Sequence, residues 1–111
     1  MKGGEALSKV ITVDFDGCLC EDAYPDIGKA IPSTIARVLC EKALGTKIIL
    51  WTCREGMELD AAIEWCRQHK IVFDAINENL PERIEQYGTN PRKIGADEYW
   101  DDKAVRVPER W

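Results

Sequence analysis

Acidic residues stand in two short groups near opposite ends of the chain. Asp14 and Asp16 are separated by one residue and followed by Gly17, and Asp101 and Asp102 are adjacent. Carboxylates at positions i and i+2 of an extended segment point the same way, and the glycine permits a sharp turn. Adjacent carboxylates repel one another unless a cation lies nearby. Each group alone also suits an ordinary acidic turn, but together they are candidate metal ligands.

The elements that must position these acids follow from the pattern of apolar residues. Apolar, β-branched runs predict strands at residues 9–14, 47–51, 72–76 and within 94–100, with a short fifth strand at 104–107. Helical spacing and capping signals predict helices that begin at Pro32, Glu58 and Pro81 and end near Gly45, His69 and Gly88. Residues 15–31 are expected to form a loop. The alternation predicts an α/β fold with a parallel sheet and helices on both faces.

Two further polar features accompany the acids. Thr52 follows the second predicted strand, and Lys93, with Arg92 beside it, precedes the fourth. Either feature alone suits a solvated turn. Ligands bind at the carboxyl ends of parallel strands, so the acids and Thr52 are expected at one edge of the sheet with a cation beside them.

This combination suits phosphoryl transfer. A carboxylate nucleophile needs a phosphorus centre whose charge is masked. Mg²⁺ held by oxygen ligands supplies that mask, a lysine adds a second positive charge, and a hydroxyl group holds a phosphoryl oxygen. The chain has no suitable His or Cys cluster, so Mg²⁺ is the expected cofactor rather than a softer metal.

The four segments resemble, in order, the four motifs of the haloacid dehalogenase superfamily. They are Asp14-x-Asp16-Gly17, Ile48-Ile49-Leu50-Trp51-Thr52, Lys93 and Tyr99-Trp100-Asp101-Asp102. From about residue 9 to 105 the chain is similar to the short, capless phosphatases of that superfamily. The resemblance implies a Rossmann-like three-layer sandwich with a mostly parallel five-stranded sheet. It also implies Mg²⁺-dependent hydrolysis of phosphate monoesters through an aspartyl-phosphate.

The resemblance further implies a role for each motif residue. Asp14 would be the nucleophile and a metal ligand. Asp16 would protonate the leaving group, then act as the base for water, and give its backbone carbonyl to the metal. Thr52 would bind the phosphoryl group, and Lys93 would neutralise it and orient Asp14.

The remaining assignments leave some choices open. Either Asp101 or Asp102 would bind the metal directly, with the other in support. Since Lys93 lies only eight residues before Asp101, Arg92 or Lys103 could be the site cation instead. The expected substrate-binding residues are Gly17, Cys53 and Arg54, with Tyr24, Glu55 and Asn77 as further candidates at the sheet's loops.

Composition argues against several other classes of protein. The chain has fifteen Lys and Arg and twenty Asp and Glu, which gives a net charge of −5, and it has no basic block. Nucleic acid is therefore expected as a partner only through a phosphorylated end. No apolar run approaches bilayer length, so no membrane association is expected. Five cysteines without a Cys-x-x-Cys pair, and no signal peptide at residues 1–8, predict reduced thiols in a cytoplasmic protein. Neither glycine-rich nucleotide motif occurs, and the single histidine, His69, argues against a zinc centre.

The length predicts one domain over residues 1–111. Residues 17–31 and 53–93 are too few to hold a cap domain beside the core elements. The site is therefore expected to be open to a small phosphorylated substrate, or covered by a second subunit in a homo-oligomer. Trp111 is a candidate for that interface, with packing on its own core as the alternative.

Other functions compete with the phosphatase hypothesis. A receiver domain also combines aspartates, a threonine and a lysine and accepts phosphate without turnover, but its phosphorylated aspartate follows strand three, where this chain has Asn77. A dehalogenase fits Asp14 but leaves Asp16 and the second acid pair without a purpose. The main alternative is therefore a non-catalytic, receiver-like phosphoacceptor or binding module on the same type of fold.

Overall fold

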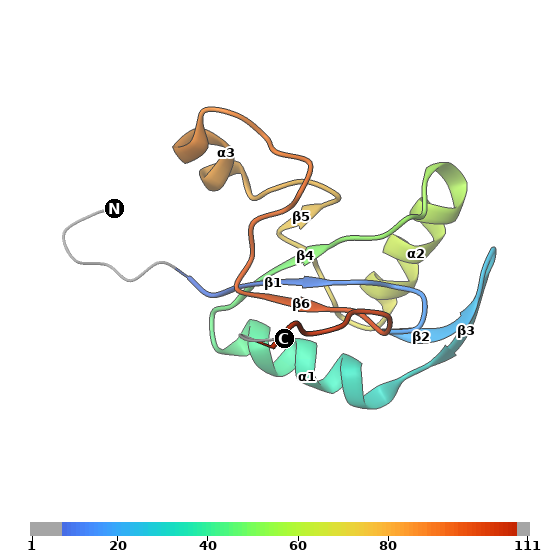
Figure 1. Ribbon diagram of the computed structural model, residues 1–111. Coiled ribbons are helices and arrows are strands. Elements are labelled where there is room, and N and C mark those ends of the chain that lie inside the picture. The colour runs from blue at the N-terminus through green and yellow to red at the C-terminus, as the bar shows by residue number, and fades with distance from the viewer. Residues whose placement is uncertain (1–7, 109–111) are drawn as a thin grey trace.

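The structure, a computed structural model, describes residues 8–108 of the 111-residue chain. Its main sheet has four parallel strands (Figure 1). In spatial order they are β5 (Ala75–Ile76), β4 (Lys47–Leu50), β1 (Val10–Val13) and β6 (Glu98–Trp100). Three helices follow strands along the chain: α1 (Pro32–Ala43), α2 (Gly56–Gln68) and α3 (Pro81–Tyr87). The predicted α/β class with a parallel sheet is confirmed.

The strands end in register, which decides what meets at the edge. Val13, the last residue of β1, lies opposite Leu50 of β4 and Trp100 of β6. Backbone hydrogen bonds continue one residue further, from Asp14 N to Trp100 O at 3.0 Å and from Trp51 N to Val13 O at 3.0 Å. The residues that follow the three strands therefore emerge side by side.

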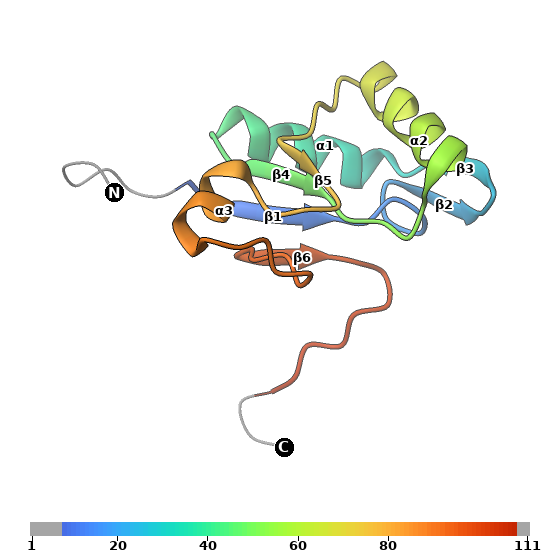
Figure 2. The same ribbon diagram turned by 90° about the horizontal axis from the view of Figure 1, so that it is seen from above.

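The two faces of the sheet are covered differently. Helices α1 and α2 lie on the same side (Figure 2) and contribute Val38, Ala62 and Cys66 to the larger apolar core. Strand residues at alternate positions, such as Ile11 and Val13 of β1, point into that core. The opposite face carries a smaller cluster, in which Val10 of β1 and Ile49 of β4 pack with Leu80 and Ile94 from the segments before and after α3. Thr12 lies on the same face of β1 as Val10 and therefore points away from α1 and α2. Asp14, which continues the alternation one residue beyond the strand, is expected on that face as well.

Residues 15–31 are not the loop that was expected. They contain an antiparallel hairpin, β2 (Cys20–Ala23) paired with β3 (Asp26–Ala30), which extends beyond the carboxyl end of β1 (Figure 1). Three of the four β2 residues are exposed, so the segment lacks the apolar alternation that identifies a strand in sequence.

The fifth parallel strand predicted at residues 104–107 is also not present. After β6 the chain runs away from the sheet (Figure 2), with 76% of Val105 and 64% of Val107 exposed. The main sheet of the described residues therefore has four strands. Residues 1–7 and Trp111, and with them the predictions about a signal peptide and a terminal interface, lie outside the described part.

Two smaller predictions can also be compared with the structure. Helix α3 has the predicted bounds, and Gly88 ends it in the left-handed conformation with φ of 75°. All five cysteines are free thiols, as expected, and three of them are buried. No helix within residues 8–108 has the length and apolar character needed to cross a bilayer.

Candidate active site

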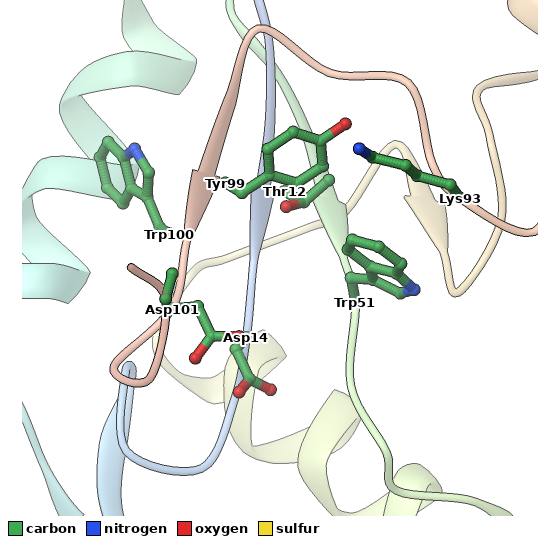
Figure 3. Close-up of a pocket in the computed structure, with 8 residues that line it drawn as sticks. Thr12, Asp14, Trp51, Lys93, Tyr99, Trp100 and Asp101 are labelled. Carbon is green, nitrogen blue, oxygen red and sulfur yellow. The ribbon is translucent and has the colours of Figure 1, made fainter. Parts of the chain in front are cut away.

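Three carboxylates from both ends of the chain converge at the carboxyl end of β1. Asp14, Asp101 and Asp102 each offer an oxygen atom, and these atoms all lie within 4.8 Å of one another. Figure 3 shows Asp14 and Asp101 side by side at one end of a pocket. The register of β1 and β6 explains the convergence, because both pairs of acids follow directly from aligned strand ends. The donor set is all oxygen and fits a hard divalent cation such as Mg²⁺.

The surroundings of Asp14 disfavour its negatively charged form, and a bound cation would offset this effect. Burial raises its pKa to about 6, and the nearby carboxylates of Asp101, Asp102 and Asp16 act in the same direction. A hydrogen bond from the Phe15 N–H to Asp14 Oδ1, at 2.8 Å, opposes the rise. No lysine or arginine within residues 8–108 forms an ion pair with Asp14. The charge on this carboxylate is therefore stabilised by one backbone donor and opposed by three acids.

Gly17 makes room for Asp102. Its φ of +82° lies in the left-handed region, and a Cβ atom at this position would overlap the Asp102 carboxylate. The glycine was expected to contact substrate; in the structure it admits the second acid pair to the backbone turn after Asp16.

One of the alternative site cations does contact the acids. Lys103 Nζ lies 3.2 Å from Asp102 Oδ2, and this hydrogen bond lowers the pKa of Asp102. The Lys103 backbone N–H donates to Asp101 Oδ1 at 2.9 Å. The Lys103 side chain is 75% exposed, so a metal ion could displace it from Asp102 at little cost.

Lys93 lies in the same pocket as Asp14 but at its other end. The cavity has a volume of about 310 Å³ and is lined by Thr12, Asp14, Trp51, Lys93, Tyr99, Trp100, Asp101 and Ala104 (Figure 3). The Lys93 ammonium points toward the Tyr99 ring, 5.9 Å from its centre. The structure thus brings together the predicted nucleophile and lysine in one pocket without direct contact between them. Arg92 does not line this cavity.

A second cavity, of about 350 Å³, lies on the other side of the acids. It is lined by Gly17, Cys18, Ile31, Thr34, Arg37, Trp100, Asp101 and Asp102. Arg37 stacks over the Trp100 ring, with its guanidinium carbon 4.8 Å from the ring centre. Since Asp101 and Trp100 line both cavities, the acid cluster is accessible from two directions.

Asp16 and Thr52 are both held by Arg54. The guanidinium donates to Asp16 from Nε (2.8 Å) and Nη2 (2.7 Å), while the Arg54 backbone N–H donates to the Thr52 hydroxyl oxygen at 3.1 Å. Thr52 N–H in turn donates to Asn77 Oδ1 at 2.8 Å. The predicted substrate contact by Arg54 is not what the structure displays, because its side chain is only 1% exposed. Cys53, which lies between Thr52 and Arg54, is by contrast exposed.

Some lining residues were not anticipated as part of a site. Thr12 is a polar residue in an otherwise apolar, buried strand, two positions before Asp14. Because residues two apart in a strand lie on the same face, this spacing could have predicted that Thr12 lines the site with Asp14. Trp51 and Tyr99 form an aromatic pair, with ring centres 5.8 Å apart, over the same face. Their meeting depends on the order β4-β1-β6, which the sequence does not reveal.

Comparisons with known proteins identify one solved structure with a clear relationship. It is a conserved protein from Bacteroides thetaiotaomicron, 40% identical in sequence, with a TM-score of 0.79. The match covers 93% of this chain and 84% of the other. No protein-family model matches the chain, and none of the curated proteins matches it.

Proposed function

We propose that this chain, which belongs to the same family as the conserved protein from Bacteroides thetaiotaomicron, is a Mg²⁺-dependent phosphatase of the haloacid dehalogenase type. The supporting observation is the convergence of Asp14, Asp101 and Asp102 within 4.8 Å at the end of the central strand. These are the acids of the first and last motifs that the sequence resembles. A purely structural role gives no reason to gather three mutually repelling carboxylates at one point.

The residues suited to hold Mg²⁺ are Asp14, one or both of Asp101 and Asp102, and the backbone carbonyl of Asp16. Their oxygen atoms match the preference of this ion. When bound, the ion would neutralise charge on the phosphoryl group.

The chain's own residues would then act in two steps. A carboxylate oxygen of Asp14 attacks phosphorus, and the bond from phosphorus to the leaving oxygen breaks as Asp16 gives that oxygen a proton. Asp16 then takes a proton from water, whose oxygen attacks the aspartyl-phosphate and releases inorganic phosphate and free Asp14. Lys93 provides positive charge to the phosphoryl group in the shared pocket.

The substrate class that fits is a small phosphate monoester, or a phosphorylated end of a larger molecule. The cavities of about 310 and 350 Å³ are large enough for a phosphoryl group with a compact leaving group. In the described residues no cap domain covers them, and the β2–β3 hairpin projects beyond this edge of the sheet (Figure 1).

A chromogenic phosphate monoester tests the proposal. We expect multiple turnovers with Mg²⁺, none in excess chelator, and recovery when Mg²⁺ is added back. Phosphate transferred once to the protein without further turnover would instead indicate a receiver-like phosphoacceptor. No reaction at all, with folded protein and saturating Mg²⁺, would reject phosphoryl transfer.

A further inference from the structure

The second cavity contains an arginine that the proposed reaction does not use. This cavity has a volume of about 350 Å³, and residues of α1 form part of its wall. Asp101 and Asp102 line it on one side, and Arg37 is the one cation among its described lining residues. Lys93 lines the first cavity and not this one. The acids have a purpose as metal ligands, whereas Arg37 has none in the reaction.

Arg37 is held in position while its hydrogen-bond donors remain free. Its guanidinium carbon lies 4.8 Å from the centre of the Trp100 ring. That ring is itself fixed, because its Nε1 donates to Glu98 Oε1 at 2.9 Å. Within residues 8–108 the guanidinium stacks on the ring without forming a hydrogen bond or an ion pair. Its five N–H donors are therefore available to a ligand.

One acid senses the charge of Arg37 but has other partners. The pKa of Glu98 is lowered by its contacts with Trp100 and Lys9, and to a smaller extent by the charge of Arg37. Lys9 Nζ lies 3.2 Å from Glu98 Oε2, and the Trp100 bond occupies Oε1. Each oxygen of Glu98 thus has a donor other than Arg37. An unpaired guanidinium beside a cavity fits the planar oxygens of a carboxylate.

The acids that share this cavity make anion binding depend on the metal. In the metal-free protein, Asp101 and Asp102 would repel an anion. A divalent cation on these carboxylates removes the repulsion and leaves Arg37 as the charge that faces the cavity. Thr34, three residues before Arg37 on α1, also lines the cavity and carries a hydroxyl donor.

We propose that Arg37, with Thr34 and Trp100, forms a subsite for a second anionic group of the substrate. The substrate is then a phosphate monoester that also carries a carboxylate, because one guanidinium matches one carboxylate in charge and in geometry. Since Asp101 and Trp100 line both cavities, the spacer between the two anionic groups is short. This inference rests on the proposed phosphatase function and narrows its substrate class.

Two small phosphate monoesters test the subsite. Carboxymethyl phosphate and ethyl phosphate are similar in size, and only the first carries a carboxylate. With Mg²⁺, we expect kcat/KM to be higher for carboxymethyl phosphate by about tenfold or more, the value of a charge-assisted hydrogen bond. Arg37→Gln, a change at an exposed position, should abolish this preference. The subsite is overturned if wild type shows no preference, or if Arg37→Gln retains it.

Equilibrium binding tests the subsite without turnover. Phosphonoacetate and ethylphosphonate are analogues with a phosphorus–carbon bond, which phosphoryl transfer does not break. In calorimetric titrations with Mg²⁺, wild type should bind phosphonoacetate more tightly than ethylphosphonate by about tenfold or more. Arg37→Gln should bind the two alike, and so should wild type in chelator, because Asp101 and Asp102 then repel the carboxylate. Equal phosphonoacetate affinities in wild type and Arg37→Gln would refute the role of Arg37.

A matched control comes from the opposite helix. Arg67 lies on α2, is 67% exposed and lines neither cavity. Arg67→Gln removes the same charge and should retain both preferences. Loss of the preferences in this variant as well would attribute them to net charge and overturn the subsite. Hydrolysis of neither phosphate monoester by wild type would reject the proposed phosphatase function, and the phosphonoacetate titration would then decide the subsite by itself.

Discussion

The carboxylate of Asp102 occupies the space that a side chain on Gly17 would need. The two residues come from opposite ends of the chain, and each belongs to one of the acidic motifs. The backbone turn after Asp16 and the position of the second acid pair are therefore interdependent.

Gly17→Ala is expected to weaken Mg²⁺ binding by displacing Asp102. Gly45→Ala is a matched control, because Gly45 also has a positive φ, +91°, but nothing lies within 4 Å of a Cβ there. Both variants should lose about 1–2 kcal/mol of stability from backbone strain. Only Gly17→Ala should also lose affinity in a calorimetric Mg²⁺ titration. Equal affinities in the two variants would show that Asp102 does not need this space.

Asp14→Asn is expected to stabilise the metal-free protein at neutral pH. The pKa of Asp14 is raised from 3.8 to about 6, chiefly by burial. The folded state therefore binds this proton more tightly than the unfolded state, and stability declines as pH rises from 3.8 to about 6. The gain from Asp14→Asn should be full above that window and absent below it.

Thermal unfolding in chelator, at neutral pH and near pH 4, measures this difference. Asp60→Asn, an exposed substitution on α2, provides the control. An Asp14→Asn protein that is no more stable than wild type at neutral pH would contradict the unfavourable environment inferred for this carboxylate.

Mg²⁺ affinity and kcat/KM should distinguish the roles of the two candidate lysines, Lys93 and Lys103. Lys103→Met removes a cation that pairs with Asp102, so Mg²⁺ should bind more tightly with kcat/KM at saturating metal unchanged. Lys93→Met removes a charge-assisted contact to the phosphoryl group, so kcat/KM should fall by about ten- to a hundredfold with Mg²⁺ affinity unchanged. The opposite pattern would make Lys103 the site cation.

Asn79 is expected to hold the segment of residues 90–95, which carries Lys93, in place. It is fully buried, donates to Asn90 Oδ1 and to the Pro91 carbonyl at 2.9 Å each, and accepts from the Gly95 N–H at 2.8 Å. Asn79→Leu leaves these groups unpaired, which costs about 1–3 kcal/mol. We expect kcat/KM to fall as in Lys93→Met, while Mg²⁺ affinity stays that of wild type. Unchanged kcat/KM would show that Lys93 does not depend on the hydrogen bonds of Asn79 to residues 90–95.

Local pattern was sufficient to predict the elements that carry the acids. Strand β1 is buried throughout and ends at Val13, just before Asp14, and α3 is bracketed by Pro81 and Gly88, so each boundary is marked by its own residues. The β2–β3 hairpin carries no such mark, since β2 is mostly exposed. Its identity as a strand comes from pairing with β3 rather than from its composition.

The electrostatic partners within the site could not be predicted. Arg54 and Asp16 are 38 positions apart, and nothing in either segment indicates which of several acids Arg54 will meet. Burial of Arg54 is likewise invisible, because an arginine in a turn is ordinarily exposed. The Lys93 ammonium lies near Tyr99, and the pairing of Tyr99 with Trp51 follows from strand order rather than from sequence spacing.

Identification of the phosphorylated residue tests the central proposal most directly. Protein mixed with a phosphate monoester and Mg²⁺, quenched in acid within one turnover and examined by peptide mass spectrometry, should carry a hydroxylamine-labile phosphoryl group on Asp14. The group should be absent without Mg²⁺ and in Asp14→Asn, which should also lack turnover. A phosphoryl group on another residue, or turnover by Asp14→Asn at a rate near that of wild type, would contradict nucleophilic attack by Asp14.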